Sequence, residues 1–249
     1  MGFEPQIRKI LAKVPTRRHT LFFTATWPPA IRRLASEFLH DAYQVQIGNR
    51  DELKGNQDIV QVVKPCSGYN KNQTLMQVLQ QAGVADRNNS AAKGICFCGT
   101  KRMCDQVSND LWRNGVPCAS IHGDKNQRER EQSLNDLKSA KIKLLVATDV
   151  AARGLDIKGI TLVVNYDLPG KTEDYVHRIG RTGRAGQKGY AVALVSDRDA
   201  HALRGIIEVM KRTNQEVPPE VERMSANAGP PPPQGRACRD KGGGKGGGK

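Results

Sequence analysis

The chain has 249 residues, of which 38% are hydrophobic and 26% are charged, a composition typical of a globular protein with one or two domains. Lys and Arg total 39 against 25 Asp and Glu, and the formal net charge of +14 favours a polyanionic partner, nucleic acid ahead of an acidic membrane surface. No apolar run is long enough for a membrane span or a signal peptide, and the six cysteines form no Cys-x-x-Cys pair that would indicate zinc, so we expect a cytoplasmic or nuclear protein with reduced thiols.

The first 47 residues predict two helices and one strand. A helix is expected over residues 4–13, a strand over 20–23, and a second helix after Pro28-Pro29, because Pro favours the first turn of a helix. One strand between two helices cannot bury a core, so residues 1–47 are predicted to be the C-terminal remnant of a larger domain. Residues 48–58 are polar and predict a linker.

Residues 59–214 are predicted to form a complete α/β domain, because short apolar runs alternate there with helical patterns. Strands are expected over residues 94–98, 118–122, 143–147, 161–165 and 190–195, with helices over 101–114 and 125–138. The runs are apolar throughout, as in strands covered on both faces. They therefore predict a parallel, doubly wound sheet whose ligands gather at the carboxyl ends of the strands.

Residues 215–249 are predicted to be a C-terminal extension that is disordered from about residue 225. Four consecutive prolines at 230–233 precede a Gly/Lys/Arg-rich end with no apolar surface to bury. Residues 243–249 match most of a phosphate-binding loop, but no strand precedes them and no Ser or Thr follows. We therefore do not expect a nucleotide site in this tail.

The most distinctive motif covers residues 175–186, where arginines recur every third residue among glycines. On one helical turn Arg178, Arg181 and Arg184 would lie on one face, and no acidic residue lies between them to neutralise their charge. The guanidinium fork suits phosphate oxygens, so an anionic ligand is the natural partner. Taken as charges alone, the run could also be a solvated basic helix end.

The order His-Arg-Ile-Gly-Arg-Thr-Gly-Arg at residues 177–184 resembles the arginine-finger motif of the DEAD-box RNA helicases, in the second of their two RecA-like domains. The resemblance implies that Arg181 and Arg184 are catalytic and reach the γ-phosphate of ATP, where phosphoryl transfer spreads negative charge over the oxygens. It also implies that His177 and Arg178 take part in coupling between the two domains.

Two further segments resemble family motifs in the expected order. Thr24-Ala25-Thr26 resembles the Ser-Ala-Thr motif that couples ATP turnover to strand separation, with Thr24 keeping the hydroxyl of the usual Ser. The segment from Gln127 to Arg130 resembles the Gln-x-x-Arg motif, which implies a coupling role for Gln127 and an RNA-phosphate contact for Arg130. Alone, each segment could be an ordinary capped strand end or a solvated helix face.

A third segment, residues 147–156, resembles the motif that follows the next strand. The resemblance implies that Thr148 and the Gly154 backbone hold RNA phosphates and that Asp156 accepts hydrogen bonds from the ribose hydroxyls of ATP. It also implies a coupling role for Arg153. A hydroxyl and an exposed amide at a strand end are suitable phosphate donors in any family.

The resemblance as a whole implies a RecA-like fold, ATP with Mg²⁺ as cofactor, and RNA held by its backbone with little sequence preference. The family's phosphate-binding loop and Asp-Glu-Ala-Asp motif do not occur in these 249 residues. We therefore expect a fragment or a truncated product that is inactive by itself, with the Mg²⁺ ligands and the first RecA-like domain supplied elsewhere. The alternative is a non-catalytic RNA-binding module. A dinucleotide-binding enzyme would need a Gly-x-Gly-x-x-Gly run after a strand, which the chain lacks.

Overall fold

The computed structural model describes residues 4–24, 29–45, 56–86, 88–89, 91–152, 157–184 and 186–228. The chain divides into two compact units, Met1–Glu52 and Leu53–Lys249. None of the described helices combines the length and the apolar composition needed to cross a membrane.

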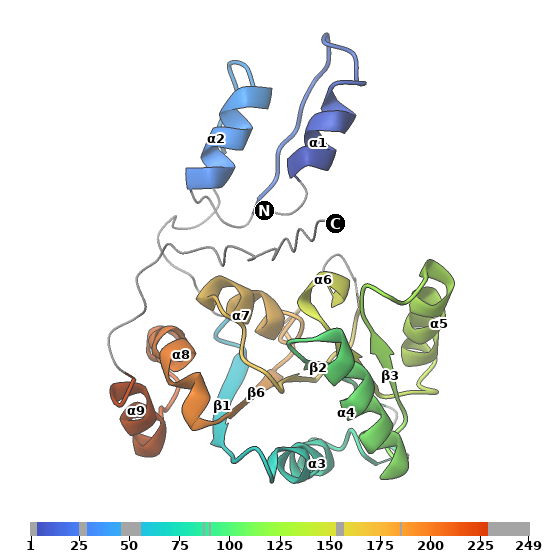
Figure 1. Cartoon of the computed structure of the whole chain (residues 1–249), viewed down its shortest axis with the longest axis vertical. Coiled ribbons are helices and arrows are strands. Elements are labelled where there is room, and N and C mark those ends of the chain that lie inside the picture. Colours follow the sequence, from blue (N-terminus) through green and yellow to red (C-terminus); the bar gives the residue numbers. More distant parts are fainter. Residues whose placement is uncertain are drawn as a thin grey trace, which may run out of the picture. The chain divides into compact units, whose positions relative to one another are not determined.

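The first unit contains α1 (Glu4–Leu11) and α2 (Pro29–Phe38), coloured blue in Figure 1. Arg8 joins the two helices: its guanidinium donates to Glu4 at 2.8 Å and to Glu37 at 2.6 Å. The strand expected at residues 20–23 is wrong, because this segment is a loop in which Leu21 and Phe23 are exposed. A strand needs a neighbour for its backbone hydrogen bonds, and the described part of this unit offers none.

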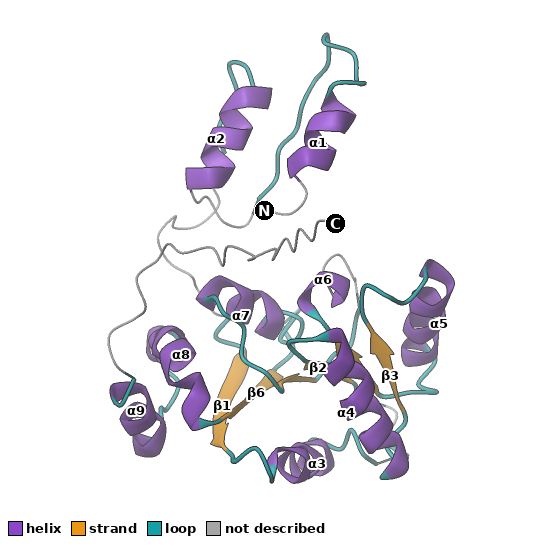
Figure 2. Ribbon diagram, in the orientation of Figure 1, coloured by secondary structure: helices purple, strands orange, loops and turns teal. Residues whose placement is uncertain are grey.

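The second unit is built on a fully parallel sheet (Figure 2), which confirms the predicted fold class. Its strand order is β1-β6-β5-β2-β4-β3. The strands are β1 (Ile59–Pro65), β2 (Gly94–Phe97), β3 (Cys118–Ile121), β4 (Leu144–Ala147), β5 (Leu162–Asn165) and β6 (Gly189–Val195). Every residue of β2, β4 and β5 is buried, as their uninterrupted apolar runs predict. Sequence analysis did not single out β1, whose buried residues alternate with partly exposed ones.

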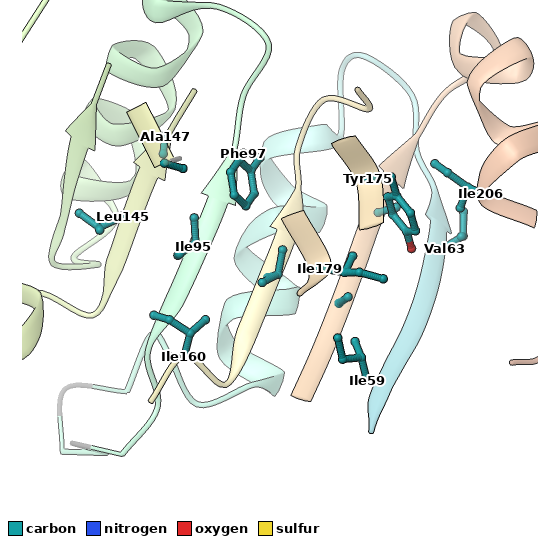
Figure 3. Packing of buried hydrophobic residues seen from close by; sticks show 14 of the residues in the cluster. Ile59, Val63, Ile95, Phe97, Leu145, Ala147, Ile160, Tyr175, Ile179 and Ile206 are labelled. Carbon is teal, nitrogen blue, oxygen red and sulfur yellow. The ribbon is translucent and has the colours of Figure 1, made fainter. Parts of the chain in front are cut away.

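Helices cover both faces of the sheet. The helices of this unit are α3 (Lys71–Gln81), α4 (Lys101–Arg113), α5 (Gln127–Lys138), α6 (Asp149–Ala152), α7 (Thr172–Ile179), α8 (Ala200–Arg212) and α9 (Pro219–Ala226). One hydrophobic cluster packs α3 and α4 against the sheet, and the other packs α5, α7, α8 and α9 against the opposite face. Figure 3 shows the second cluster, in which Tyr175 and Ile179 of α7 face the strands.

The domain continues past residue 214, where we expected a boundary. Val221 of α9 is fully buried in the same cluster as α8, and Arg204 of α8 hydrogen-bonds to the carbonyl of Ala228. The change to a Pro- and Gly-rich composition therefore comes after the last packed helix. The residues beyond 228, which include most of the segment predicted to be disordered, lie outside the described part of the chain.

Candidate functional site

Most of the motif segments meet at one edge of the sheet, where the parallel strands end. Asp149 follows β4, Asn165 ends β5, and α7 returns across these ends. A small cavity at this edge is lined by residues of two motif segments and by two neighbours: Phe97, Asp149, Ala152, Asp174, His177, Arg178 and Arg181. Sequence analysis predicted that ligands gather at the carboxyl ends of the strands, and this is the edge at which these segments lie.

Arg178 makes the most hydrogen bonds described at this edge and is almost completely buried, with 3% of its surface exposed. Its Nε and Nη2 donate to the two carboxylate oxygens of Asp149 at 2.6 and 2.7 Å. Its Nη1 donates to the Asn165 side chain at 3.0 Å and to the Asp167 carbonyl at 2.6 Å, and the guanidinium lies 5.1 Å from the centre of the Phe97 ring. This bidentate geometry fixes α7 against the ends of β4, β5 and β2.

The shared helical face predicted for the three arginines is wrong. Helix α7 ends at Ile179, where Gly180 is the C-cap, so only Arg178 lies on the helix. Arg178 is buried, Arg181 is partly exposed and Arg184 is exposed, with its Nε donating to the Gly180 carbonyl at 2.9 Å. Glycine at position 180 favours the helix end, and the remaining arginines therefore project from a turn.

The turn after α7 is shaped by close packing. Gly183 has φ +66°, and a Cβ there would come within 2.4 Å of the Ile59 side chain. The Thr182 hydroxyl donates to the Ile160 carbonyl at 2.7 Å, and the Asn56 amide donates to the Gly183 carbonyl. These contacts hold the segment between Arg181 and Arg184 in one conformation against the start of β1.

Asp167 extends the network beyond the residues that sequence analysis singled out. Its carboxylate accepts from Lys71 Nζ at 3.0 Å and from the Gly99 backbone N–H at 2.8 Å. Lys71 also lies 4.5 Å from the centre of the Tyr166 ring. The sequence signal that could have indicated a role for Asp167 is its position as an acidic residue just after a buried strand. Its contacts with α3 and with the end of β2 follow from the strand order, which the sequence does not show.

Arg130 and Thr148 lie on the other side of α6. Arg130 of α5 donates from Nη2 to the Ala151 carbonyl at 3.4 Å, while its buried Nε has no hydrogen-bond partner among the described residues. The Thr148 carbonyl accepts from the Ala152 N–H at 3.0 Å, so Thr148 immediately precedes the first turn of α6. The four-residue helix α6 is therefore held by Arg130 at its C-terminal end and by Arg178 at its N-terminal end.

The other predicted site residues have more peripheral positions. Gln127 is exposed at the start of α5 and donates to Glu131 at 2.8 Å, and His177 is exposed beside the small cavity. Thr24 lies in an exposed loop of the first unit, which is described by itself. Four predicted residues lie outside the described part of the chain: Thr26, Arg153, Gly154 and Asp156.

A polar cluster after β3 was not assigned a role by sequence analysis. Buried His122 places Nε2 3.1 Å from both carboxylate oxygens of Asp105, and the Ser120 hydroxyl donates to the same carboxylate at 2.6 Å. Partial burial opposes ionisation of Asp105, but the hydrogen bonds from Ser120 and His122 outweigh it and lower the pKa of this carboxyl below its usual value. The cluster joins α4 to the end of β3 beside the start of α5.

Comparison with known proteins decides the family. The model of the helicase conserved C-terminal domain matches residues 70–186. DEAD-box ATP-dependent RNA helicase 46 of Arabidopsis thaliana is 49% identical over 229 residues, 92% of this chain and 34% of the relative. The ATP-dependent RNA helicase DBP2 of Saccharomyces cerevisiae (strain ATCC 204508 / S288c) is 44% identical over 234 residues, 93% of this chain and 42% of the relative. The chain belongs to the DEAD-box RNA helicase family.

Solved structures agree with this assignment. A variant of Dbp5 from S. cerevisiae, bound to RNA and ADP BeF3, matches with a TM-score of 0.71 and 27% identity over 91% of this chain and 58% of that one. The ADP-bound RNA helicase Prp28 of Chaetomium thermophilum matches with a TM-score of 0.59 and 32% identity over 89% of this chain and 51% of that one. The RecA-like fold and the family resemblance are thereby confirmed. The chain spans 34% and 42% of the two curated relatives, and corresponds to their C-terminal helicase domain.

Proposed function

We propose that this chain supplies the second RecA-like half of an ATP-dependent RNA helicase, contributing two arginines to ATP and part of an RNA-backbone track. The observation that carries the proposal is the position of α6 between Arg130 and Arg178. The segment predicted to contact RNA and the segment predicted to contact ATP are thus joined to the same short helix at one edge of the sheet.

The ATP contacts of the proposal rest on the turn after α7. Both arginines follow Arg178, which is buried and anchors the segment. Gly183, which lies between Arg181 and Arg184 in the sequence, packs tightly against Ile59. A cation fixed at the γ-phosphate stabilises the charge that develops during transfer, and a finger arginine raises the rate by roughly a thousand- to a hundred-thousand-fold. Asp156 is proposed to accept from the ribose hydroxyls.

Mg²⁺ is the metal that ATP-dependent enzymes of this kind use, and this half does not fit it. In the described ranges no three His, Cys, Asp or Glu side chains gather to hold a metal ion. Asp149, which lies beside the arginine segment, has both carboxylate oxygens engaged by Arg178. The ligands of the metal are therefore proposed to belong to a first RecA-like domain.

The RNA contacts are proposed to be made by Arg130, Thr148 and the Gly154 backbone. Arg130 has a buried Nε without a partner in the described part of the chain, and Thr148 lies at the same strand end. Phosphate contacts of this kind carry little sequence information, so recognition by the RNA backbone is expected. The affinity should therefore fall steeply as the salt concentration rises.

Hydrolysis tests the proposal and its alternative, a non-catalytic RNA-binding module. The chain as printed should show no RNA-stimulated ATP turnover, because its sequence contains neither the phosphate-binding loop nor the Asp-Glu-Ala-Asp motif. Joined to the preceding part of a DEAD-box first RecA-like domain, it should gain turnover that depends on Arg181 and Arg184. Turnover by the chain alone would contradict the need for a first domain, and no turnover after the join would favour the binding module.

A further inference from the structure

The edge strand β3 borders an open groove of about 600 Å³ that the helicase site does not use. Helices α4 and α5 flank β3 at the end of the strand order, as Figure 1 shows. The groove is lined by residues of both helices and of the strand between them: Ser108, Asn109, Trp112, Cys118, Ala119, Ser120, Lys125, Arg128, Glu129, Gln132 and Ser133.

The floor of the groove is an unpaired strand edge. The bonds from Lys143 N to the Pro117 carbonyl and from Thr148 N to the Ile121 carbonyl show that the odd-numbered residues of this strand face β4. Because strand residues alternate, the backbone groups of Cys118 and Ser120 point away from β4. Within the described residues, neither the N–H nor the C=O of Ser120 has a hydrogen-bond partner.

Trp112 closes one end of this edge. Its indole Nε1 donates to the Cys118 carbonyl at 2.6 Å, yet the side chain remains 53% exposed. The indole therefore satisfies one backbone group of the edge and leaves an aromatic face beside the groove. Amphipathic aromatic side chains with a fixed orientation are typical anchors of peptide-binding surfaces.

The charge of the groove selects an acidic occupant. Arg128 is exposed at the start of α5, and the described residues give it no ion-pair partner. The carboxylate of Glu129 already accepts the Asn126 N–H at 2.7 Å in the capping box of α5. Lys125 lies 3.6 Å from Asp105 and remains partly exposed. Among the charged side chains of the lining, the cations Arg128 and Lys125 therefore outnumber the one carboxylate, which is engaged in the cap.

We propose that this groove binds an extended, acidic peptide of a protein partner, which pairs with the free edge of β3. The peptide backbone would bond to the N–H and C=O of Ser120, one side chain would pack on Trp112, and an acidic residue would pair with Arg128. RNA fits less well, because the floor offers both a donor and an acceptor of a strand edge, whereas phosphates require donors only.

Strand pairing can be tested with one matched pair of variants. Because the Ser120 N–H does not pair with β4, Ser120→Pro removes the donor offered to the peptide and leaves the bonds between β3 and β4 in place. Ser120→Ala keeps the N–H and loses only the hydroxyl bond to Asp105. The charge is tested by Arg128→Glu, with Arg102→Glu as its control at the equivalent second position of α4.

The experiment selects binders from a library of random linear peptides displayed on phage, with the whole chain as bait, and measures affinity by fluorescence anisotropy. We expect acidic peptides whose affinity falls about tenfold in Ser120→Pro and about fivefold in Arg128→Glu, with both controls within about twofold. N-methylation along the peptide should weaken binding at every second position. Thermal melting confirms that each variant is folded, and if Ser120→Pro unfolds, the N-methyl scan decides.

Four results would overturn the proposal. Selection could yield no peptide above the background of an unrelated basic protein, or peptides indifferent to Arg128→Glu. The N-methyl scan could show no alternation. Finally, oligouridylate RNA could compete with the peptide and lose affinity equally in Arg128→Glu, which would make the groove an RNA site instead.

Discussion

Replacing Arg178 by Ala should destabilise the second unit strongly, although this arginine belongs to the motif predicted to serve ATP. The side chain is 3% exposed and makes two bonds to Asp149, one to Asn165 and one to the Asp167 carbonyl. Truncation leaves the Asp149 carboxylate and the Asn165 amide without their partner. Breaking a buried pair by removing one member costs about 3–5 kcal/mol of unfolding free energy.

The lower part of that range is more appropriate here, because the Asp149 side chain is 32% exposed and water can replace part of the lost interaction. For a unit of this size, about 3 kcal/mol corresponds to a fall in Tm of roughly 6–12 °C. Urea unfolding followed by far-UV circular dichroism measures the free energy directly. Arg178→Lys should recover only part of it, since a single ammonium cannot reproduce the bidentate fork.

Arg184→Ala is the matched control, because it removes an exposed arginine of the same segment, whose Nε donates to the Gly180 carbonyl. It should cost less than about 1 kcal/mol. If Arg178→Ala unfolds at the same urea concentration as the wild type, or if both variants lose the same stability, Arg178 is not the structural anchor described here.

Three further predictions concern the turn, the C-terminus and the polar cluster. Gly183→Ala should cost at least about 1–2 kcal/mol, because φ is +66° and the new Cβ would meet Ile59; Gly170→Ala, where a Cβ has open space, is the control, and equal unfolding midpoints would contradict the turn geometry. Truncation after residue 228 should leave Tm unchanged and flatten the salt dependence of RNA binding, whereas truncation after 214 removes the buried Val221 and should lower Tm by several degrees; the opposite order would refute the assignment of α9 to the core. Because the folded pKa of Asp105 is depressed, its contribution to stability is present above the unfolded pKa of about 3.9 and is lost as pH falls through the folded pKa; Asp105→Asn should therefore reduce the acid-induced loss of stability, and an unchanged pH profile would argue against the cluster.

The parallel sheet was predictable because its central strands are buried on both faces and so have uninterrupted apolar sequences, as in β4 and β5. In β1, buried residues alternate with partly exposed ones, so this strand lacks the uninterrupted apolar run of the central strands. The segment at residues 20–23 has the composition of a strand but no pairing partner in the described part of its unit. Composition indicates whether a segment can adopt a strand conformation, whereas strand formation also requires a neighbouring strand to pair with.

The candidate site was predictable as a set of segments but not as a set of roles. Motif order places Arg178, Arg181 and Arg184 together, but their different exposures follow from the end of α7 at Ile179, which the three-residue spacing does not reveal. Asp167 was missed because its partners, Lys71 and Gly99, come from the start of α3 and from the loop after β2. Such contacts depend on strand order, which no local pattern encodes.

The central claim is that RNA and ATP contacts are coupled through this half of the helicase, and nucleotide-dependent RNA affinity tests it most directly. The chain would be joined to the preceding part of a DEAD-box first RecA-like domain, and its affinity for single-stranded RNA measured with and without ADP–BeF3. We predict that the nucleotide tightens RNA binding in the wild type, and that Arg184→Ala abolishes the tightening while leaving the nucleotide-free affinity unchanged. Equal tightening in the wild type and in Arg184→Ala would contradict the account.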